Sequence, residues 1–316
     1  MKNRLFVWSC IVMTFFSACQ QAENEKNEVD ELRMSIAASI KGQTEMSDSR
    51  YSGTDPTTVD FDESDEIGVF VDDGSAVKWT YSTSGWGADE VIYWPDKTGL
   101  HTFYAFYPYS TATSYASVPM PSLLNQTGTL AGISECDFLV TSVSQTYGTD
   151  GVVRFQDDNA FRHVSSLLQL TINGKGDLSS STLKKITITG TNIVAPTTYS
   201  FEDEAVSLVP DDASDELSLS MDLELLNEDK TFYFIVNEKK DASAVVKLSI
   251  EYETDGKIYV AEMEGFANNV FGGGLRQSYT ITIKDSSLII SGASISSWGE
   301  GESLDDVVIN GELQES

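Results

Sequence analysis

The stretch VVKLSIEYETDGKIYVAEM, residues 245–263, carries the clearest secondary-structure pattern of this 316-residue chain. From Val246 to Tyr252, apolar residues alternate with polar ones, which is the period of a half-buried β-strand. Asp255-Gly256 follows, a dipeptide typical of two-residue hairpin turns, and a second strand-like segment comes directly after it. The stretch therefore predicts an antiparallel β-hairpin.

The same kind of pattern fills the chain from Phe61 onward. Short apolar or aromatic runs are separated by turn residues, and no helical period is longer than about two turns. Representative runs are EIGVFV, HTFYAFYPY, SSLLQLTING, TFYFIVNE and SYTITIKD. Many short strands with turn signals between them indicate β-sandwiches. The sequence predicts an all-β fold of two sandwich domains, which meet near residues 155–164, where an acidic turn precedes a new run of strands.

An isolated strand is predicted before this region, at residues 32–40. Its alternate residues are apolar and share one face: Leu32, Met34, Ile36, Ala38 and Ile40. Residues 42–60 are small, polar and turn-forming, so they read as an exposed loop, and this loop contains Arg50. A protease would reach such a loop readily.

The N-terminus has the features of an export signal. Lys2 and Arg4 precede an apolar run from Leu5 to Phe16, which is shorter than the roughly 20 residues of a membrane-spanning helix. Ser17-Ala18-Cys19 then resembles the lipobox of bacterial lipoproteins, in which the cysteine is acylated and becomes the first mature residue. The alternative is an ordinary secretory signal with an incidental cysteine. Residues 1–18 are thus interpreted as a lipoprotein signal peptide, and residues 19–31 as an acidic tether.

Composition narrows the classes of partner. Without residues 1–18 the chain has 18 Lys+Arg against 49 Asp+Glu, a net charge of −31. Such an acidic surface argues against nucleic acid and against anionic lipid head groups as ligands. After Cys19 only Cys136 remains, so no internal disulfide is expected, and Cys136 is interpreted as a small buried residue.

Signals for catalysis or cofactors are weak. The two histidines, His101 and His163, lie in apolar or aromatic settings without a nucleophile motif nearby, and there is no phosphate-binding loop or metal-binding motif. We expect no enzyme activity, no cofactor and no metal. The aromatic run around Trp94 and Phe103 predicts a sandwich core, with a sugar-stacking platform as the alternative.

Six segments in order resemble the fimbrillin family, the subunits of type V pili of Bacteroidia. They are SDEIGVFV, IYWPDKTGLHTFYAFYPYS, SECDFLVTS, FRHVSSLLQLTI, FGGGLRQSYTITIK and ISGASISSWGEGE. The resemblance implies a lipoprotein precursor with two transthyretin-like Greek-key β-sandwich domains, placed here at residues 32–160 and 161–316. It also implies that the protein is exposed on the cell surface, at the outer membrane and in the fimbrium, where a lipid anchor holds it. The partners that it implies are other fimbrial subunits and a surface ligand of a host or microbial cell.

In that family a protease cuts after an arginine near the N-terminus, the first strand is lost, and a strand of another subunit fills the groove. The resemblance makes residues 32–40 the displaced strand and Arg50 the cleavage site. Arg33 is the second candidate, although it lies inside the strand pattern. Residues Val307, Ile309 and Leu313 share a face near the C-terminus and form a candidate donor strand, with an ordinary edge strand or frayed tail as the alternative.

Three classes of function are compatible with the sequence. The favoured one is a structural or adhesive pilus subunit. The others are a surface lipoprotein that binds glycans without polymerising and a hydrolase, which has the least support in the sequence.

Cys19→Ala is expected to abolish lipid labelling and to release the protein from the membrane, because the thiol is the only attachment point for acyl chains. Metabolic lipid labelling and membrane fractionation measure both effects. Cys10→Ala is the control, since Cys10 lies within the apolar run. A Cys19 variant that is unlabelled yet still tightly held by the outer membrane would contradict the lipobox.

Overall fold

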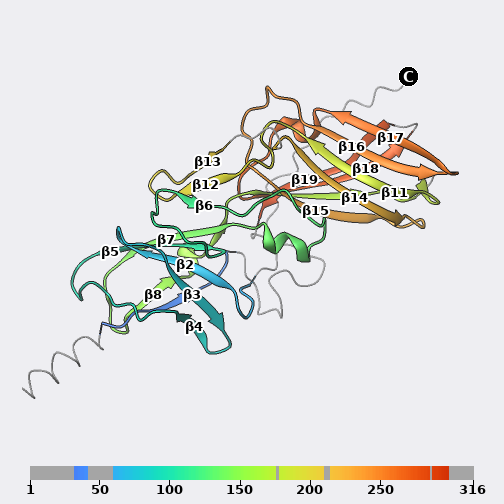
Figure 1. Cartoon of the computed structure of the whole chain (residues 1–316). Helices are drawn as coiled ribbons and strands as arrows, with labels where there is room; N and C mark the ends of the chain where they lie inside the picture. Colours follow the sequence, from blue (N-terminus) through green and yellow to red (C-terminus); the bar gives the residue numbers. More distant parts are fainter. Residues whose placement is uncertain (1–31, 42–59, 176–177, 210–213, 285–286, 299–316) are drawn as a thin grey trace, which may run out of the picture.

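The structure is a computed structural model that describes residues 32–41, 60–175, 178–209, 214–284 and 287–298. These residues form an all-β fold (Figure 1), as predicted, and their helical turns are short 3-10 segments: η1 Ala131–Glu135, η2 Asp157–Asn159 and η4 Phe266–Asn269. Within the described part of the chain, no helix has the length and apolar character needed to span a membrane.

The first half contains a six-stranded antiparallel sheet in the order β4-β3-β2-β5-β7-β9. Its strands are β2 Glu66–Val71, β3 Val77–Ser82, β4 Gly85–Ala88, β5 His101–Tyr107, β7 Leu139–Gln145 and β9 Arg162–His163. Successive residues of β5 point to opposite faces. Phe103 joins the core on one face and Phe106 the core on the other, and both are fully buried. The sheet is therefore covered on both sides.

Two small sheets provide the covers. Parallel strands β1 Ser35–Ala38 and β8 Val152–Phe155 form one of them. The other contains β6 Val118–Pro119, β12 Thr197–Ser200 and β13 Ala205–Leu208 in the order β13-β12-β6. Figure 1 shows β6, β12 and β13 on one side of the six-stranded sheet and β8 on the other. Since β12 and β13 follow β9 in the chain, the second half supplies part of the cover of the first.

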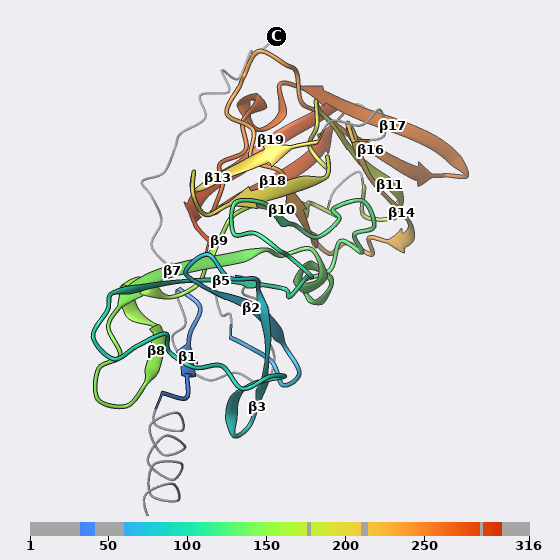
Figure 2. The same cartoon turned by 60° about the vertical axis from the view of Figure 1, so that its left-hand side comes forward.

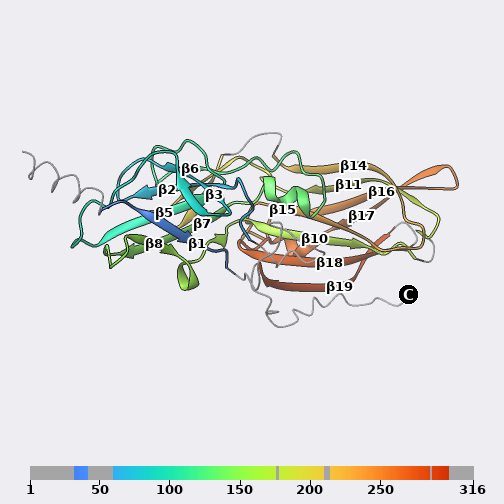
Figure 3. The same cartoon turned by 90° about the horizontal axis from the view of Figure 1, so that it is seen from below.

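The second half is a β-sandwich. Its strands run in the order β14-β11-β16-β17-β19-β18-β10-β15, but β17 and β19 share only the residue pair Glu262 and Ser287. Figure 3 shows the resulting two layers, with β14, β11, β16 and β17 in one and β19, β18, β10 and β15 in the other. Their bounds are β10 Ser166–Ile172, β11 Thr182–Thr189, β14 Glu216–Glu224, β15 Lys230–Val236, β16 Lys247–Thr254, β17 Lys257–Glu264, β18 Leu275–Lys284 and β19 Ser287–Ser297.

The hairpin predicted at residues 245–263 is confirmed as β16 and β17, with Thr254 paired to Lys257. Asp255 and Gly256 have φ angles of 51° and 70°, which suit a two-residue turn whose twist matches that of the strands. Leu248 and Ile250 are fully buried, as the alternation requires.

Two glycines allow the loop before β18 to pack closely against the residues that follow β9. A Cβ atom on Gly273 would lie 2.8 Å from the carbonyl oxygen of Val164. Gly274 has a φ of 67°, a conformation that favours glycine, and its amide donates to the carbonyl of Ser165 at 2.9 Å. Figure 2 shows β9 between the two halves. The domain limits near residues 155–164 and the transthyretin-like topology stay predictions.

Phe201→Ala is expected to destabilise the protein by about 3–5 kcal/mol, because it leaves a cavity in a packed aromatic core. Phe201 is 7% exposed, and its ring centroid lies 5.2 Å from that of Tyr104 on β5. Chemical denaturation measures the change, and Leu208→Ala, a truncation of an exposed residue on β13, is the control. A loss for Phe201→Ala as small as that expected for Leu208→Ala would show that Phe201 does not contribute to the core of the first half.

Candidate functional site

Residues 32–41 lie across one face of the first half with their alternate side chains inside. Met34, Ile36 and Ile40 are 4%, 7% and 1% exposed. Leu32 and Ala38 are partly buried against the same core. The segment therefore contributes an apolar stripe to the main core, on the face that the period of two indicates.

Backbone hydrogen bonds hold this segment at both ends. At its start, the amide of Met34 donates to Ile92 O and the amide of Trp94 donates to Leu32 O, each at 2.8 Å. At its end, the amide of Ser39 donates to Phe155 O at 2.9 Å, and the 39–41 backbone pairs with Phe161. Three separate parts of the chain thus hold one short segment.

Strand β8 depends on this segment. Within the described residues β1 is the only strand that pairs with β8, from Ser35 opposite Val152 to Ala38 opposite Phe155. The other edge of β8 is capped by the side chain of Gln145, whose amide donates to Val152 O at 2.8 Å. Without residues 32–41, β8 would present an unpaired backbone edge, the kind of edge to which another strand adds.

The neighbours of this segment are apolar and buried. Val153, Phe155 and Phe161 are fully buried, and Trp94 is 1% exposed. The Trp94 indole donates to Gly151 O at 2.8 Å, so it is fixed in place. Burial of three side chains from the segment is worth roughly 5–9 kcal/mol, and a strand that refilled the site would gain free energy in proportion to the apolar area that it buries there.

The other residues of the predicted maturation lie outside the described residues. These are Cys19, Arg50, Val307, Ile309 and Leu313. Their roles, and that of residues 32–40 as a displaced strand, stay predictions.

Both histidines pair with carboxylates. His101 Nδ1 lies 2.8 Å from Asp72 Oδ2, and His163 Nδ1 lies 2.9 Å from Asp137 Oδ1. The His163–Asp137 pair is fully buried. No three acidic, histidine or cysteine side chains of the described ranges converge in a way that would hold a metal ion.

Cys136 is buried, as predicted, with 4% of its surface exposed. Burial, followed by the nearby Glu135 and Asp137 carboxylates, raises the pKa of its thiol to about 11. A nucleophilic cysteine needs a lowered pKa, so this thiol is poorly suited to covalent chemistry.

The aromatic run forms core, as predicted. Trp94, Phe103 and Phe106 are each 1% exposed or less, while Tyr93 is 39% exposed. Buried rings cannot stack on a sugar, so Trp94, Phe103 and Phe106 do not supply the platform that the alternative required.

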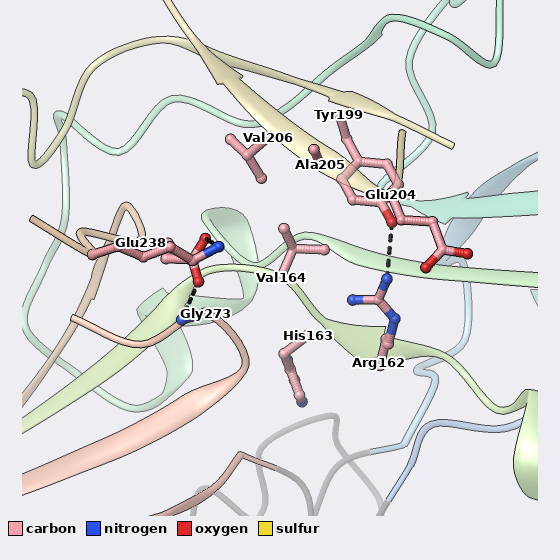
Figure 4. Close-up of a pocket in the computed structure, with 10 residues that line it drawn as sticks. Arg162, His163, Val164, Tyr199, Glu204, Ala205, Val206, Glu238 and Gly273 are labelled. Carbon is pink, nitrogen blue, oxygen red and sulfur yellow. Dashed lines mark hydrogen bonds and ion pairs between the residues drawn. The ribbon is translucent and has the colours of Figure 1, made fainter. Parts of the chain in front are cut away.

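A polar pocket of about 230 Å³ lies where β9 meets the β12–β13 hairpin (Figure 4). The Arg162 guanidinium donates to the hydroxyl of Tyr199 at 2.9 Å, and Lys240 pairs with Glu238 at 2.9 Å. Charges of both signs line it, without a nucleophile. The sequence did not indicate this pocket, because its residues come from segments far apart in the chain and show no common pattern.

Comparisons with known proteins agree with this architecture. A family model described as fimbrillin-like matches residues 50–298. A search of curated proteins found no match.

Three solved structures share the fold, each a crystal structure of a candidate cell adhesion protein. The protein of Bacteroides uniformis is 18% identical, with a TM-score of 0.57, over 84% of this chain and 99% of that one. The protein of Bacteroides ovatus is 14% identical, with a TM-score of 0.58, over 84% and 97%. The protein of Bacteroides fragilis is 15% identical, with a TM-score of 0.51, over 88% and 100%.

Ile40→Ala is expected to lower the free energy of unfolding by about 2–5 kcal/mol, because Ile40 fills a closed part of the core. Ser35→Ala in the same 32–41 segment should change it by less than about 0.5 kcal/mol, since the Ser35 side chain is exposed. Denaturant titration of both variants tests the pair. A small effect of Ile40→Ala would mean that the strand is only loosely attached.

Proposed function

Because this chain belongs to the fimbrillin-like family, we propose that it is a structural or adhesive subunit of a cell-surface fimbria that assembles by strand exchange. One observation carries the mechanism: a short segment supplies both a buried apolar stripe and the only strand partner of β8 in the described residues. Its removal would leave a groove that a strand from a neighbouring subunit fits.

In this proposal the precursor is exported as a lipoprotein with Cys19 as its lipid anchor in the outer membrane. Cleavage after Arg50 then separates residues 32–41 from the rest of the chain. The alternative site, Arg33, is a poor one, because Arg33 is bridged to Tyr93 and a cut there would leave Met34 to Ile40 in place. Arg50 is favoured for that reason.

The incoming strand must repeat the period of the strand that leaves. Val307, Ile309 and Leu313 have that period and lie near the C-terminus, so a neighbouring copy can donate them. The partners are then other fimbrial subunits, together with a surface ligand of a host or microbial cell.

A second candidate is an anchored lipoprotein that binds glycans without polymerising. The polar pocket between β9 and the β12–β13 hairpin is the feature that favours it, since Arg162, Glu204 and Glu238 offer donors and acceptors for hydroxyl groups. The burial of Trp94, Phe103 and Phe106 counts against it.

Arg50→Ala is expected to leave lipidated, full-length monomers on the cell, because the first strand stays covalently joined. Deletion of residues 305–316 is expected to stop the subunit from donating to others while it still accepts a strand. Polymer ladders on gels after partial denaturation, together with mass spectrometry of the mature N-terminus, measure both effects.

Arg33→Ala is the matched control and should polymerise normally. If the Arg50 variant and the deletion both form polymers of normal length, and the mature N-terminus stays at Cys19, strand exchange is excluded and the glycan-binding alternative gains support.

A further inference from the structure

A second pocket adjoins the polar pocket between β9 and the β12–β13 hairpin. Its volume is about 380 Å³, and the loop after β11, the end of β13 and the segment after β15 line it. Both pockets are lined by Glu238 and Lys240, whose side chains pair at 2.9 Å. The two pockets are therefore neighbours that share this ion pair.

Strand β13 contributes one aliphatic side chain to each pocket. Val206 lines the polar pocket and Leu208 lines the second pocket. Alternate residues of a strand share a face, so these two side chains lie about 7 Å apart along β13. Val206 is half-buried and Leu208 is 44% exposed, so both can contact the C–H groups of a ligand. A ligand that reaches both pockets has to extend along β13.

The charges in both pockets are balanced. The charged residues that line one pocket or the other are Arg162, Lys239, Lys240, Glu204, Glu238 and Asp241. Each pocket has two cations and two carboxylates among them. The chain without residues 1–18, in contrast, has a net charge of −31. A charged ligand would leave this balance unmet, so the pockets favour a neutral ligand with many polar groups.

The polar pocket offers hydrogen bonds of both kinds. Figure 4 shows Arg162 and Tyr199 on one side of it and Glu238 on the other. The Tyr199 oxygen accepts from the Arg162 guanidinium at 2.9 Å, which leaves the hydroxyl proton for an acceptor. Burial raises the pKa of the Tyr199 hydroxyl, so this proton is retained at neutral pH. The Glu204 carboxylate is exposed and accepts from any donor that enters.

The second pocket repeats this chemistry with neutral groups. Thr191 is exposed and has a hydroxyl, which both donates and accepts. Asn192 Oδ1 accepts from the Ser214 hydroxyl at 3.3 Å, so its NH₂ group remains as a donor. A ligand hydroxyl can likewise donate and accept, and it matches both pockets without a charge.

We propose that the two pockets form one binding site for an unbranched neutral oligosaccharide of at least two rings, which lies along β13 and crosses the Glu238–Lys240 ion pair. The inference rests on the adhesive part of the proposed function, for which it names the class of surface ligand and the place where it binds. A peptide fits less well, because pockets for peptide side chains are mostly apolar, and each of these pockets has a largely polar lining.

The first experiment uses the purified, unlipidated chain from Gln20 to Ser316. It is applied to an array of oligosaccharides of one to four rings that includes neutral, sialylated, sulfated and amino sugars. We expect binding to neutral chains of two or more rings and weaker binding to single rings. Separate arms with mammalian and with microbial glycans distinguish the two sources of the ligand.

The second experiment titrates the strongest neutral ligand and its single-ring unit into three variants. Tyr199→Phe keeps the buried ring and removes the hydroxyl, so it should weaken both ligands about 3- to 10-fold. Leu208→Ala should weaken the longer ligand alone, because a single ring occupies the polar pocket. Ile258→Ala is the matched control, since Ile258 is an exposed aliphatic residue of β17, and it should change neither affinity.

The site is overturned if the array shows no binding or binding only to charged glycans. It is also overturned if Tyr199→Phe and Leu208→Ala bind the longer ligand as tightly as Ile258→Ala does. Both measurements use monomers and need no cleavage at Arg50. Failure of the proposed function would appear instead as missing cleavage or missing polymers on cells, so the two failures are distinguishable.

Discussion

The insertion of residues 32–41 between three other parts of the chain is the contact on which the first half depends. The segment pairs with residues 92–94, with β8 and with Phe161, and it places Met34, Ile36 and Ile40 in the core. A strand with this role cannot be removed without a replacement, because it satisfies backbone groups and apolar surface at the same time. These contacts make the strand necessary to the fold. The polar, turn-forming sequence of residues 42–60 next to it offers a place where a protease could separate it from the rest of the chain.

The second constraint is that the six-stranded sheet is buried on both faces. Phe103 and Phe106 lie on opposite sides of β5, and each has a core to enter. One cover is the β1–β8 pair, and the other is the sheet of β6, β12 and β13. The first half therefore depends on the N-terminal segment for one face and on a hairpin from the second half for the other. A sandwich built in this way is not independent of its neighbour, even where a turn in the sequence suggests a boundary.

Much of this architecture could be predicted from the sequence, because alternating apolar residues mark the buried face of a strand. Period-two patterns identified β16 and β17 with their Asp255-Gly256 turn, and they identified the buried face of residues 32–40. A pattern of this kind shows which side of a strand is buried but not what covers it. The pairing of β6 with β12 and the stack of His163 on Trp298 join residues that are far apart in the chain, so local patterns contain no trace of them.

In the proposed exchange, covalent connection decides which strand occupies the groove. Before cleavage, residues 42–59 join the first strand covalently to the domain that it completes. This connection gives the strand a high effective concentration at its own site, which a strand from another subunit cannot match. The candidate donor presents Val307, Ile309 and Leu313 against the larger set Leu32, Met34, Ile36, Ala38 and Ile40, so on apolar area alone it would lose. Cleavage breaks this connection. Once the first strand dissociates, it diffuses away from its subunit and does not rebind. A weaker donor can win only after that step, which is why proteolysis, and not affinity, has to set the direction of assembly.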